Sequence, residues 1–330
     1  MSFSLQSLLS FSGIFKQMKS KIRRGKTNFL QRRCLALPEE LCCRFSLAEI
    51  KAATNNFHKD MVIAKGDSGF IYGGMINDGF FAIKRLRPST NSLLPLQELK
   101  CGARMLCQLH HSNIVSLVGW CEEKGEMIHV YEYVSSGTLY DHLHGKDSDP
   151  LPWKRMLEIC IGVARALHYL HTGARFVVIH RDVTSSSRNI LLDGQWTAKL
   201  YNFGFSKRGP HSMMTNRPSH KADVYSFGVV LFEVLCCRRV FDATLNGDQR
   251  HLNRWACKCI ENGTIYDIID PYLKGRIASE YFKKFVEIAY SCVSFDVNKR
   301  PAMGEVEVTL ELALERQNKA DSKMECSSSR

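Results

Sequence analysis

The chain has 330 residues, of which 45% are hydrophobic and 24% are charged, and its formal net charge is +12. This length and composition suffice for a full hydrophobic core, which excludes a wholly disordered chain. The first 38 residues contain eight basic residues and no acidic one, and subtracting these eight leaves a net charge of only +4 for the rest. We therefore predict a basic arm on an ordinary globular body, with no nucleic-acid partner.

Residues 1–43 form the predicted basic arm. No stretch of the chain reaches the roughly 18 apolar residues that a membrane-spanning helix needs. Apolar residues recur in the arm at helical spacing, so one interpretation is a helix within residues 1–33 that lies on an anionic surface, at the inner face of the plasma membrane. A solvated, largely disordered arm and an organelle transit peptide are the alternatives. The spaced apolar residues are Phe11, Ile14, Phe15, Met18 and Ile22.

Thirteen cysteines are scattered along the chain, and two pairs are adjacent in sequence, Cys42-Cys43 and Cys236-Cys237. They do not form the paired Cys-x-x-Cys spacing of a metal site. We interpret them as reduced thiols of a cytoplasmic protein, mostly in the core.

Residues 44–60 are a lead-in segment with a predicted short helix. Ser46 is a residue type that favours the helix N-cap, and Glu49 follows three residues later, which is the pattern of a capping box. The helical pattern continues to Phe57.

Residues 61–134 have the pattern of strands. Short apolar runs at 61–63, 70–72 and 80–84 predict strands, and the turn residues Asn77-Asp78-Gly79 predict a hairpin between the last two. We expect a helix over residues 96–109 and two further strands over 114–121 and 127–133.

From residue 135 to residue 315 the periodicity is helical. A long amphipathic helix is predicted around residues 156–170, and the nearly all-apolar segment 223–232 predicts a buried helix. Residues 316–330 are polar and Ser-rich, and we expect a disordered tail there. The periodic apolar residues of the first helix are Met156, Cys160, Val163, Leu167 and Leu170.

Three motifs point to a chemistry: His180-Arg181-Asp182, then Asn189-Ile190-Leu191-Leu192, then Asn202-Phe203-Gly204. They resemble the catalytic loop and the metal-binding turn of protein kinases. The resemblance implies an α+β, two-lobed protein-kinase-like fold, with a small β-rich N-lobe that carries one main helix and a larger, mostly α-helical C-lobe. It also implies ATP and Mg²⁺ as ligands. Asp182 would accept the proton of the substrate hydroxyl, and Asn189 and Asn202 would hold the metal.

The segment from residue 63 to residue 84 resembles the Gly-rich loop and the phosphate-binding strand of the same family. Gly66 and Gly69 remain where backbone amides approach the phosphates, while Ala64 replaces the first glycine. Lys84 would reach the phosphates and act with Asp182 in catalysis. Residues 130–134 resemble the segment that binds adenine through its backbone. The implied nucleotide-binding residues are Ile63, Gly66, Gly69, Ile71, Ala82, Lys84, Tyr131, Glu132 and Val134.

The chain departs from the family pattern around the metal and the lysine. Gly102 stands where a glutamate would pair with the lysine, and Glu98 is the nearest carboxylate, about one helical turn away. Thr184 replaces the catalytic-loop lysine, and two extra residues precede Asn189. Asn202 replaces a magnesium-binding aspartate and brings no negative charge.

The activation segment also departs from the family pattern. The stretch between Gly204 and Asp223 is much shorter than the family's segment, which ends in a Pro-Glu motif. Arg300 is the family's partner for that missing glutamate, so we expect its side chain to be partly exposed or paired elsewhere. Together these changes predict weak or absent metal binding and impaired phosphotransfer.

From residue 44 to about residue 315 the chain is similar to the cytoplasmic kinase domain of plant malectin-like receptor kinases of the FERONIA type. We favour a pseudokinase that serves as scaffold or regulator for an active receptor-like kinase or an immune receptor and binds ATP weakly. The alternatives are a weakly active Ser/Thr kinase, and an incomplete copy whose missing segment is an error of the gene model. The most similar segments are 44–57, 151–154, 157–162, 167–174, 270–275 and 300–306.

Overall fold

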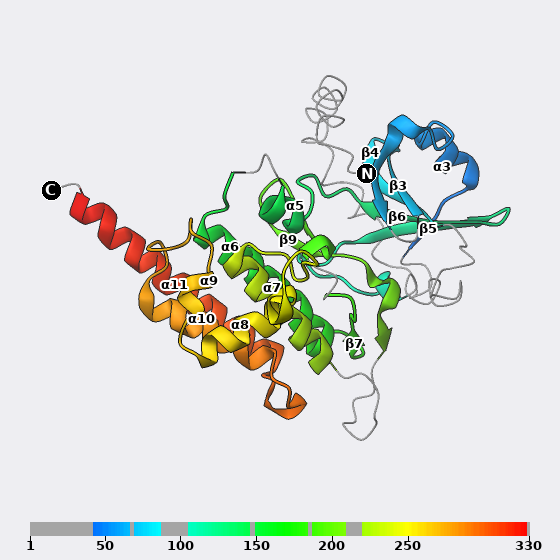
Figure 1. The fold of residues 1–330 in the computed structure, drawn as a ribbon. Coiled ribbons are helices and arrows are strands. Elements are labelled where there is room, and N and C mark those ends of the chain that lie inside the picture. Colours follow the sequence, from blue (N-terminus) through cyan, green and yellow to red (C-terminus); the bar gives the residue numbers. More distant parts are fainter. Residues whose placement is uncertain are drawn as a thin grey trace. The chain divides into compact units, whose positions relative to one another are not determined.

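The computed structural model describes residues 42–66, 69–86, 105–145, 149–183, 187–208 and 220–328. These residues form two compact units (Figure 1). Unit 1 contains the described residues up to 86, together with 105–108 and 116–133. Unit 2 contains residues 109–115 and the described residues from 134 onward. Unit 1 is β-rich and unit 2 is mostly helical, which confirms the predicted α+β, kinase-like fold class.

Unit 1 is built on a six-stranded sheet with the strand order β1-β5-β6-β4-β3-β2. Strands β1 and β5 pair in parallel, and the other neighbouring strands pair in antiparallel fashion. The predicted hairpin is present, because β3 and β4 pair along their whole length around the turn at Asn77 and Asp78. The strands are β1 Cys43–Arg44, β2 Val62–Gly66, β3 Gly69–Ile76, β4 Gly79–Leu86, β5 Leu117–Glu123 and β6 Glu126–Glu132.

The lead-in helix α3 (Leu47–Ala53) packs on this sheet. Its capping box is present, with the Ser46 hydroxyl accepting from the Glu49 amide at 3.2 Å and the Glu49 carboxylate accepting from the Ser46 amide at 2.8 Å. Leu47 and Ile50 are buried in the core that the sheet shares with this helix. The helix ends four residues before Phe57, because residues 55–57 adopt positive φ angles of 47°, 55° and 57° that no helix contains. A 3₁₀ turn at Lys59–Met61 then leads into β2.

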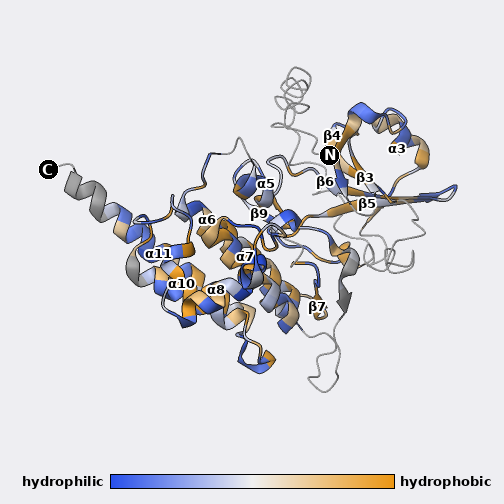
Figure 2. Cartoon of the chain, in the orientation of Figure 1, coloured by the Kyte–Doolittle hydropathy of each residue, from blue (hydrophilic) through white to orange (hydrophobic). Residues whose placement is uncertain are grey.

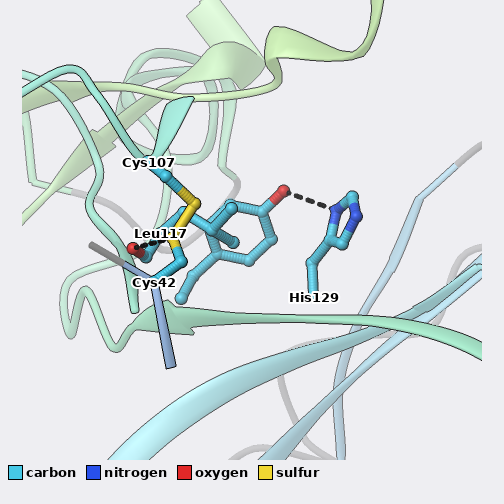
Figure 3. The surroundings of a disulfide bond; sticks show 5 residues. Cys42, Cys107, Leu117 and His129 are labelled. Atoms are coloured by element: carbon cyan, nitrogen blue, oxygen red, sulfur yellow. Dashed lines mark hydrogen bonds between the residues drawn. A yellow bond between two sulfur atoms is a disulfide. The ribbon is translucent and has the colours of Figure 1, made fainter. Parts of the chain in front are cut away.

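A disulfide in unit 1 contradicts one of our interpretations. Cys42 and Cys107 are bonded, with their Cα atoms 5.7 Å apart (Figure 3). The prediction of reduced thiols is therefore wrong for this pair. Free thiols are found at Cys43, Cys121, Cys160, Cys236, Cys237, Cys257, Cys259 and Cys292. The two partners lie 65 residues apart. Only the folding of the lead-in segment against residues 105–108 brings them together, so no local spacing could have revealed the pair.

Unit 2 is organised around the buried helices α6 (Trp153–His168) and α7 (Lys221–Cys236). The predicted amphipathic helix is confirmed, since its periodic apolar residues are all buried, and a π-helical turn at Tyr169–Gly173 continues it. The prediction of a buried helix over residues 223–232 is also confirmed, because almost all of α7 is shielded from solvent. Figure 2 shows both hydrophobic and hydrophilic residues along α6 and α10 (Ser279–Cys292), as expected for helices that pack on one face.

Two small sheets and the remaining helices and turns complete unit 2. One sheet pairs β8 with β9 and the other pairs β7 with β10, both antiparallel. No helix in the described residues combines the length and the apolar content that a membrane span needs. The strands are β7 Val178–Ile179, β8 Ile190–Leu192, β9 Ala198–Leu200 and β10 Lys207–Arg208. The remaining helices are α5 Leu139–His144, α8 Leu252–Glu261, α9 Ile265–Ile268 and α11 Met303–Ser328, with 3₁₀ turns at Ser187–Asn189, Phe203–Phe205, Gly247–Arg250 and Val297–Lys299.

The prediction of a disordered tail is wrong over residues 316–328, because α11 continues to Ser328. Gln317 is 3% exposed and donates to the carbonyl oxygen of Arg276 at 3.2 Å, which attaches this part of the helix to unit 2. Glu315 and Lys319 form an ion pair at helical spacing that further supports it. The polar residues Arg316, Lys319 and Ser322 lie on an exposed face of this helix.

Several predictions lie outside the described residues. They are the basic arm up to residue 41, most of the helix predicted over residues 96–109, and the positions Glu98, Gly102 and Thr184. The shortened segment after Arg208 also lies outside them up to residue 219.

Candidate functional site

The catalytic-loop motif lies in unit 2, directly after strand β7. His180 is fully buried, and its Nε2 atom lies 3.0 Å from the carbonyl oxygen of Tyr201. Burial lowers the pKa of His180, although the carboxylates of Asp223 and Asp182 act in the opposite direction. The ring is therefore favoured in its neutral form, in which it positions the loop.

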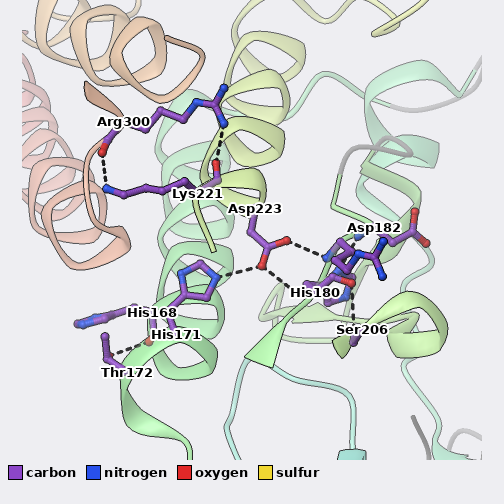
Figure 4. Close-up of polar contacts among 10 residues, drawn as sticks. His168, His171, Thr172, His180, Asp182, Ser206, Lys221, Asp223 and Arg300 are labelled. Carbon is purple, nitrogen blue, oxygen red and sulfur yellow. Dashed lines mark hydrogen bonds and ion pairs between the residues drawn. The ribbon is translucent and has the colours of Figure 1, made fainter. Parts of the chain in front are cut away.

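Asp223, near the start of α7, anchors this loop (Figure 4). Its carboxylate is completely buried and accepts hydrogen bonds from the backbone amides of His180 and Arg181, each at 2.8 Å. The ring of His171 lies 3.0 Å from the same carboxylate. A buried carboxylate is tolerated when its oxygens are bonded in this way. Asp223 therefore fixes the backbone from which Asp182 projects.

Asp182 is brought together with Asn189 and Asn202, as the sequence predicted. The Asn202 side-chain amide donates to the Oδ2 atom of Asp182 at 2.7 Å. The Asn189 amide donates to the same Oδ2 atom at 3.1 Å and to the backbone oxygen of Asp182 at 2.7 Å. One carboxylate oxygen thus accepts two amide protons.

Asn202 adopts a left-handed conformation, with φ of 71° and ψ of 60°, at the start of a 3₁₀ turn. Asparagine and aspartate tolerate this region better than other residues that carry a side chain. The strand pair β8–β9 holds the two asparagines near each other, because the Tyr201 amide donates to the carbonyl oxygen of Asn189 at 2.9 Å.

These residues are a poor donor set for Mg²⁺. Asp182 contributes a carboxylate, but Asn189 and Asn202 are neutral amides whose nitrogens face it. Magnesium prefers oxygen ligands that include carboxylates. Within the described residues, no cluster of three or more His, Cys, Asp or Glu side chains could hold a metal ion. The geometry fits hydrogen bonding better than it fits a divalent cation.

The predicted phosphate lysine, Lys84, lies in unit 1 on strand β4 and is only 8% exposed. In the sheet it is registered opposite His129 of β6. His129 is also buried, and its Nδ1 atom lies 3.2 Å from the hydroxyl of Tyr131 (Figure 3). Burial, and to a smaller extent the charge of Lys84, lower the pKa of His129 to about 4. His129 is therefore neutral at physiological pH, a feature that our sequence analysis missed.

The other predicted nucleotide residues in unit 1 lie on the same sheet. Gly66 and Gly69 are paired at the end of the β2–β3 hairpin, and Ala82 is registered opposite Tyr131. Ile63 lies on β2 and Ile71 on β3, where it pairs with Lys84. At the end of β6, the Glu132 carboxylate accepts from the Ser116 amide at 2.9 Å, and Val134 belongs to unit 2.

The expectation for Arg300 is confirmed. Its side chain is partly exposed, and its guanidinium donates to the carbonyl oxygens of Ser294 at 2.8 Å and Lys221 at 3.0 Å. It also lies over the ring of Tyr225, 4.8 Å from the centroid. Lys221 donates in return to the carbonyl oxygen of Arg300, so the two residues tie the start of α7 to the turn before α11 (Figure 4). Backbone carbonyls thus take the place of a carboxylate.

A second buried carboxylate of α7 was also missed. Glu233 is completely buried, lies 2.9 Å from the Nε2 atom of His144 and accepts from the Ser187 amide at 3.2 Å. The signal was present in the sequence, because Asp223 and Glu233 are the two acidic residues of a helix that is otherwise almost entirely apolar. Charges in such a helix must be paired when the helix is buried.

Comparison with known proteins agrees with this picture. Residues 57–310 match the family model described as protein tyrosine and serine/threonine kinase. The receptor-like protein kinase FERONIA of Arabidopsis thaliana is 45% identical over 319 residues, which cover 90% of this chain and 35% of that protein. ANXUR2 is 46% identical over 302 residues, and ANXUR1 is 44% identical over 301 residues, both from the same plant. Each alignment covers 85% of this chain and 35% of the relative.

The chain thus spans about a third of the length of these relatives. The family in general uses ATP and Mg²⁺. With the match over 254 residues, the kinase motifs and the two-unit α+β fold together, the chain belongs to the protein tyrosine and serine/threonine kinase family, and its kinase domain is of the FERONIA type.

Proposed function

We propose that this protein is a pseudokinase: a kinase-fold module that binds protein partners and transfers phosphoryl groups very slowly or not at all. The observation that carries the proposal is the double hydrogen bond on Asp182. Its Oδ2 atom accepts from Asn202 at 2.7 Å and from Asn189 at 3.1 Å. One of the two carboxylate oxygens of Asp182 therefore already accepts two hydrogen bonds. They come from the amide nitrogens of Asn189 and Asn202, the two residues that would hold the metal.

The size of the expected defect follows from the metal. A bound magnesium ion neutralises charge that develops on the transferred phosphoryl group. If the loss of one carboxylate removes about 3 kcal/mol of this stabilisation, the rate falls by roughly a hundredfold. Lys84, Asp182 and Asn189 are retained, which supports the alternative of a weakly active Ser/Thr kinase. The incomplete-copy alternative would be settled by sequencing the transcript across codons 205 to 225.

A phosphotransfer assay tests the proposal. The full chain is incubated with labelled ATP, with magnesium or manganese, and with a generic basic protein substrate, beside the variant Asp182→Ala. We expect no labelling that distinguishes the two proteins. Clear labelling by the unmodified chain that Asp182→Ala abolishes would establish the weak-kinase alternative.

We propose that the protein binds ATP weakly and with little dependence on metal. Gly66, Gly69 and the buried Lys84 support a phosphate-binding role in unit 1, whereas the donors around Asp182 are unsuited to Mg²⁺. A ligand that binds only the folded state stabilises it by about 2.7 kcal/mol at a hundredfold excess over Kd. A thermal-shift assay should show a small rise with ATP that persists when magnesium is chelated. A large rise that requires magnesium would contradict this proposal.

As partners we propose an active receptor-like kinase or an immune receptor, because the similar proteins are receptor-like kinases. We also propose that residues 1–33 bind an anionic membrane surface and place the protein at the inner face of the plasma membrane. The full chain should pellet with anionic vesicles at low salt, and the double change Phe15→Ser with Met18→Ser should release it. Equal pelleting of the two proteins would show that the apolar stripe of the arm makes no contribution.

A further inference from the structure

Unit 2 contains a pocket of about 360 Å³ away from Asp182, which the kinase chemistry does not use. It lies between the end of α5, the loop after α7, the 3₁₀ turn Gly247–Arg250 and the start of α8. A volume of this size falls in the range of small-molecule and side-chain binding sites. The lining residues that matter here are His144, Arg238, Arg239, Asp242, Leu252 and Trp255.

Two adjacent arginines supply the positive charge of this pocket, and the charge of Arg239 also acts on the carboxylate of Asp242. Hydrogen bonds from Thr244, and to a smaller extent this charge, lower the pKa of that carboxyl group. Arg238 and Arg239 are both exposed, and no hydrogen bond or ion pair joins either guanidinium to another described residue. Arg238 lies over the ring of Trp255, 4.7 Å from its centroid, which leaves the edge of its guanidinium open to a ligand. The Oδ1 atom of Asp242, which also lines the pocket, accepts from the amide and the hydroxyl of Thr244 at 2.9 and 2.6 Å.

The walls of the pocket are held in place by buried groups. His144 forms one side, and its ring is fixed at 2.9 Å from the carboxylate of Glu233, with side-chain exposures of 6% and 0%. Cys237 ends α7 in a left-handed conformation, with φ of 46°, so the chain turns sharply just before the two arginines. Leu252 is buried, and Leu143 and Leu245 add apolar surface. The pocket therefore exists without a ligand.

We propose that this pocket binds a phosphorylated segment of a partner protein, with the phosphate between Arg238 and Arg239. A phosphoserine or phosphothreonine carries about −1.5 to −2 charges at pH 7 and three strong acceptor oxygens. Guanidinium groups present donors in a planar fork that matches phosphate geometry. Leu143, Leu245 and Trp255 contact the residues on either side of the phosphate.

A carboxylate matches the site less well than a phosphate does. A carboxylate offers two acceptor oxygens and one negative charge to the two guanidinium groups, whereas a phosphate offers three oxygens and up to two charges. The choice of a phosphorylated protein as ligand rests on the proposed function, in which one proposed partner is an active receptor-like kinase, whose chemistry produces phosphorylated residues. The binding test does not measure phosphotransfer, so its failure is distinguishable from a failure of the pseudokinase proposal.

The test measures binding of a fluorescein-labelled heptapeptide with a central phosphothreonine flanked by leucines, using fluorescence anisotropy with the full chain. Two further peptides carry threonine or glutamate at the centre. The protein variant is Arg238→Gln with Arg239→Gln. The matched control is Arg254→Gln, which removes a positive charge from an exposed position of α8 outside the pocket lining.

We expect the phosphorylated peptide to bind at least tenfold more tightly than the threonine and glutamate peptides. The double variant should lose about tenfold to a hundredfold in affinity, as expected for the loss of hydrogen bonds to a charged group, while Arg254→Gln changes it less than twofold. Equal binding of the three peptides would overturn the proposal. Equal losses in the double variant and in Arg254→Gln would also overturn it, because they would indicate attraction to net charge alone.

Discussion

Replacing Asn202 by aspartate tests the arrangement around Asp182 most directly. The change removes the amide that donates to Asp182 and puts a second carboxylate in its place. The Asn202 nitrogen that it replaces lies 2.7 Å from the Oδ2 atom of Asp182. Two unit charges at this distance repel by about 1.5 kcal/mol in water and about 6 kcal/mol at an effective dielectric constant of about 20. Asp182 is partly exposed, so solvent screens the repulsion toward the lower value.

The lost hydrogen bond adds to this repulsion. A hydrogen bond to a charged acceptor contributes about 1.5–3 kcal/mol, so Asn202→Asp should destabilise unit 2 by about 3 kcal/mol in the presence of a chelator. For a unit of this size we expect a fall in Tm of about 6 to 12 °C. Adding Mg²⁺ should restore much of the loss, because the ion binds two carboxylates and cancels their repulsion.

Thermal unfolding in chelator and in millimolar Mg²⁺ measures both effects. Asn202→Ser removes the donor without adding charge and should show a smaller loss and no response to magnesium. Asn246→Asp makes the same chemical change at an exposed N-cap, where asparagine and aspartate are about equally favourable, and should leave Tm nearly unchanged. If Asn202→Asp melts at the temperature of the unmodified chain with and without magnesium, Asp182 and Asn202 do not interact as described.

Three further predictions concern the cores of the two units. His129 has a pKa of about 4 in the folded chain and 6.5 in the unfolded chain, so as pH falls from 6.5 toward 4 only the unfolded chain takes up the proton and stability is lost. Its contribution to the free energy of unfolding should be about 2 kcal/mol smaller at pH 5 than at pH 7, and urea melts of His129→Leu should lack this part of the pH dependence. The Cys42–Cys107 disulfide joins residues 65 apart, and closing such a loop stabilises by about 4 kcal/mol in the chain-entropy account. Dithiothreitol should therefore lower the free energy of unfolding of the unmodified chain in urea melts but not that of Cys107→Ser. An equal decrease in both proteins would show that the disulfide is not the cause of the decrease. Asp223→Ala leaves the amides of His180 and Arg181 without their acceptor and should lower the free energy of unfolding by about 3–5 kcal/mol. Asp223→Asn keeps one acceptor oxygen and should lower it less. Equal losses in thermal melts would contradict the role of Asp223 as the acceptor that holds this loop.

Features whose causes are local in sequence were predictable. The capping box of α3 depends on two residues three positions apart, and the hairpin depends on the turn at residues 77–79, so both could be identified without knowing the fold. The helices α6 and α7 were likewise visible from apolar periodicity and apolar content. The predicted end of α3 was less accurate, because three residues with positive φ angles, which the sequence pattern does not reveal, follow this helix.

Features that depend on distant residues were not predictable in the same way. The Cys42–Cys107 bond and the pairing of Glu233 with His144 each join segments more than 60 residues apart. The tail was misjudged because composition cannot distinguish a disordered polar segment from a helix with an exposed face. Gln317 shows the difference, since it is buried against Arg276 although its residue type is usually exposed.

The change at residue 202 illustrates what a structure adds to a motif comparison. From the sequence, Asn202 indicates only the loss of a metal-binding carboxylate. In the folded chain its amide is also a donor, and it bonds the Oδ2 atom of Asp182. An aspartate at this position requires a cation to offset its repulsion with Asp182, whereas an asparagine stabilises the loop without one. An asparagine at this position therefore removes a carboxylate from the predicted metal site and adds a hydrogen bond to the metal-free fold, which agrees with the binding module that we propose.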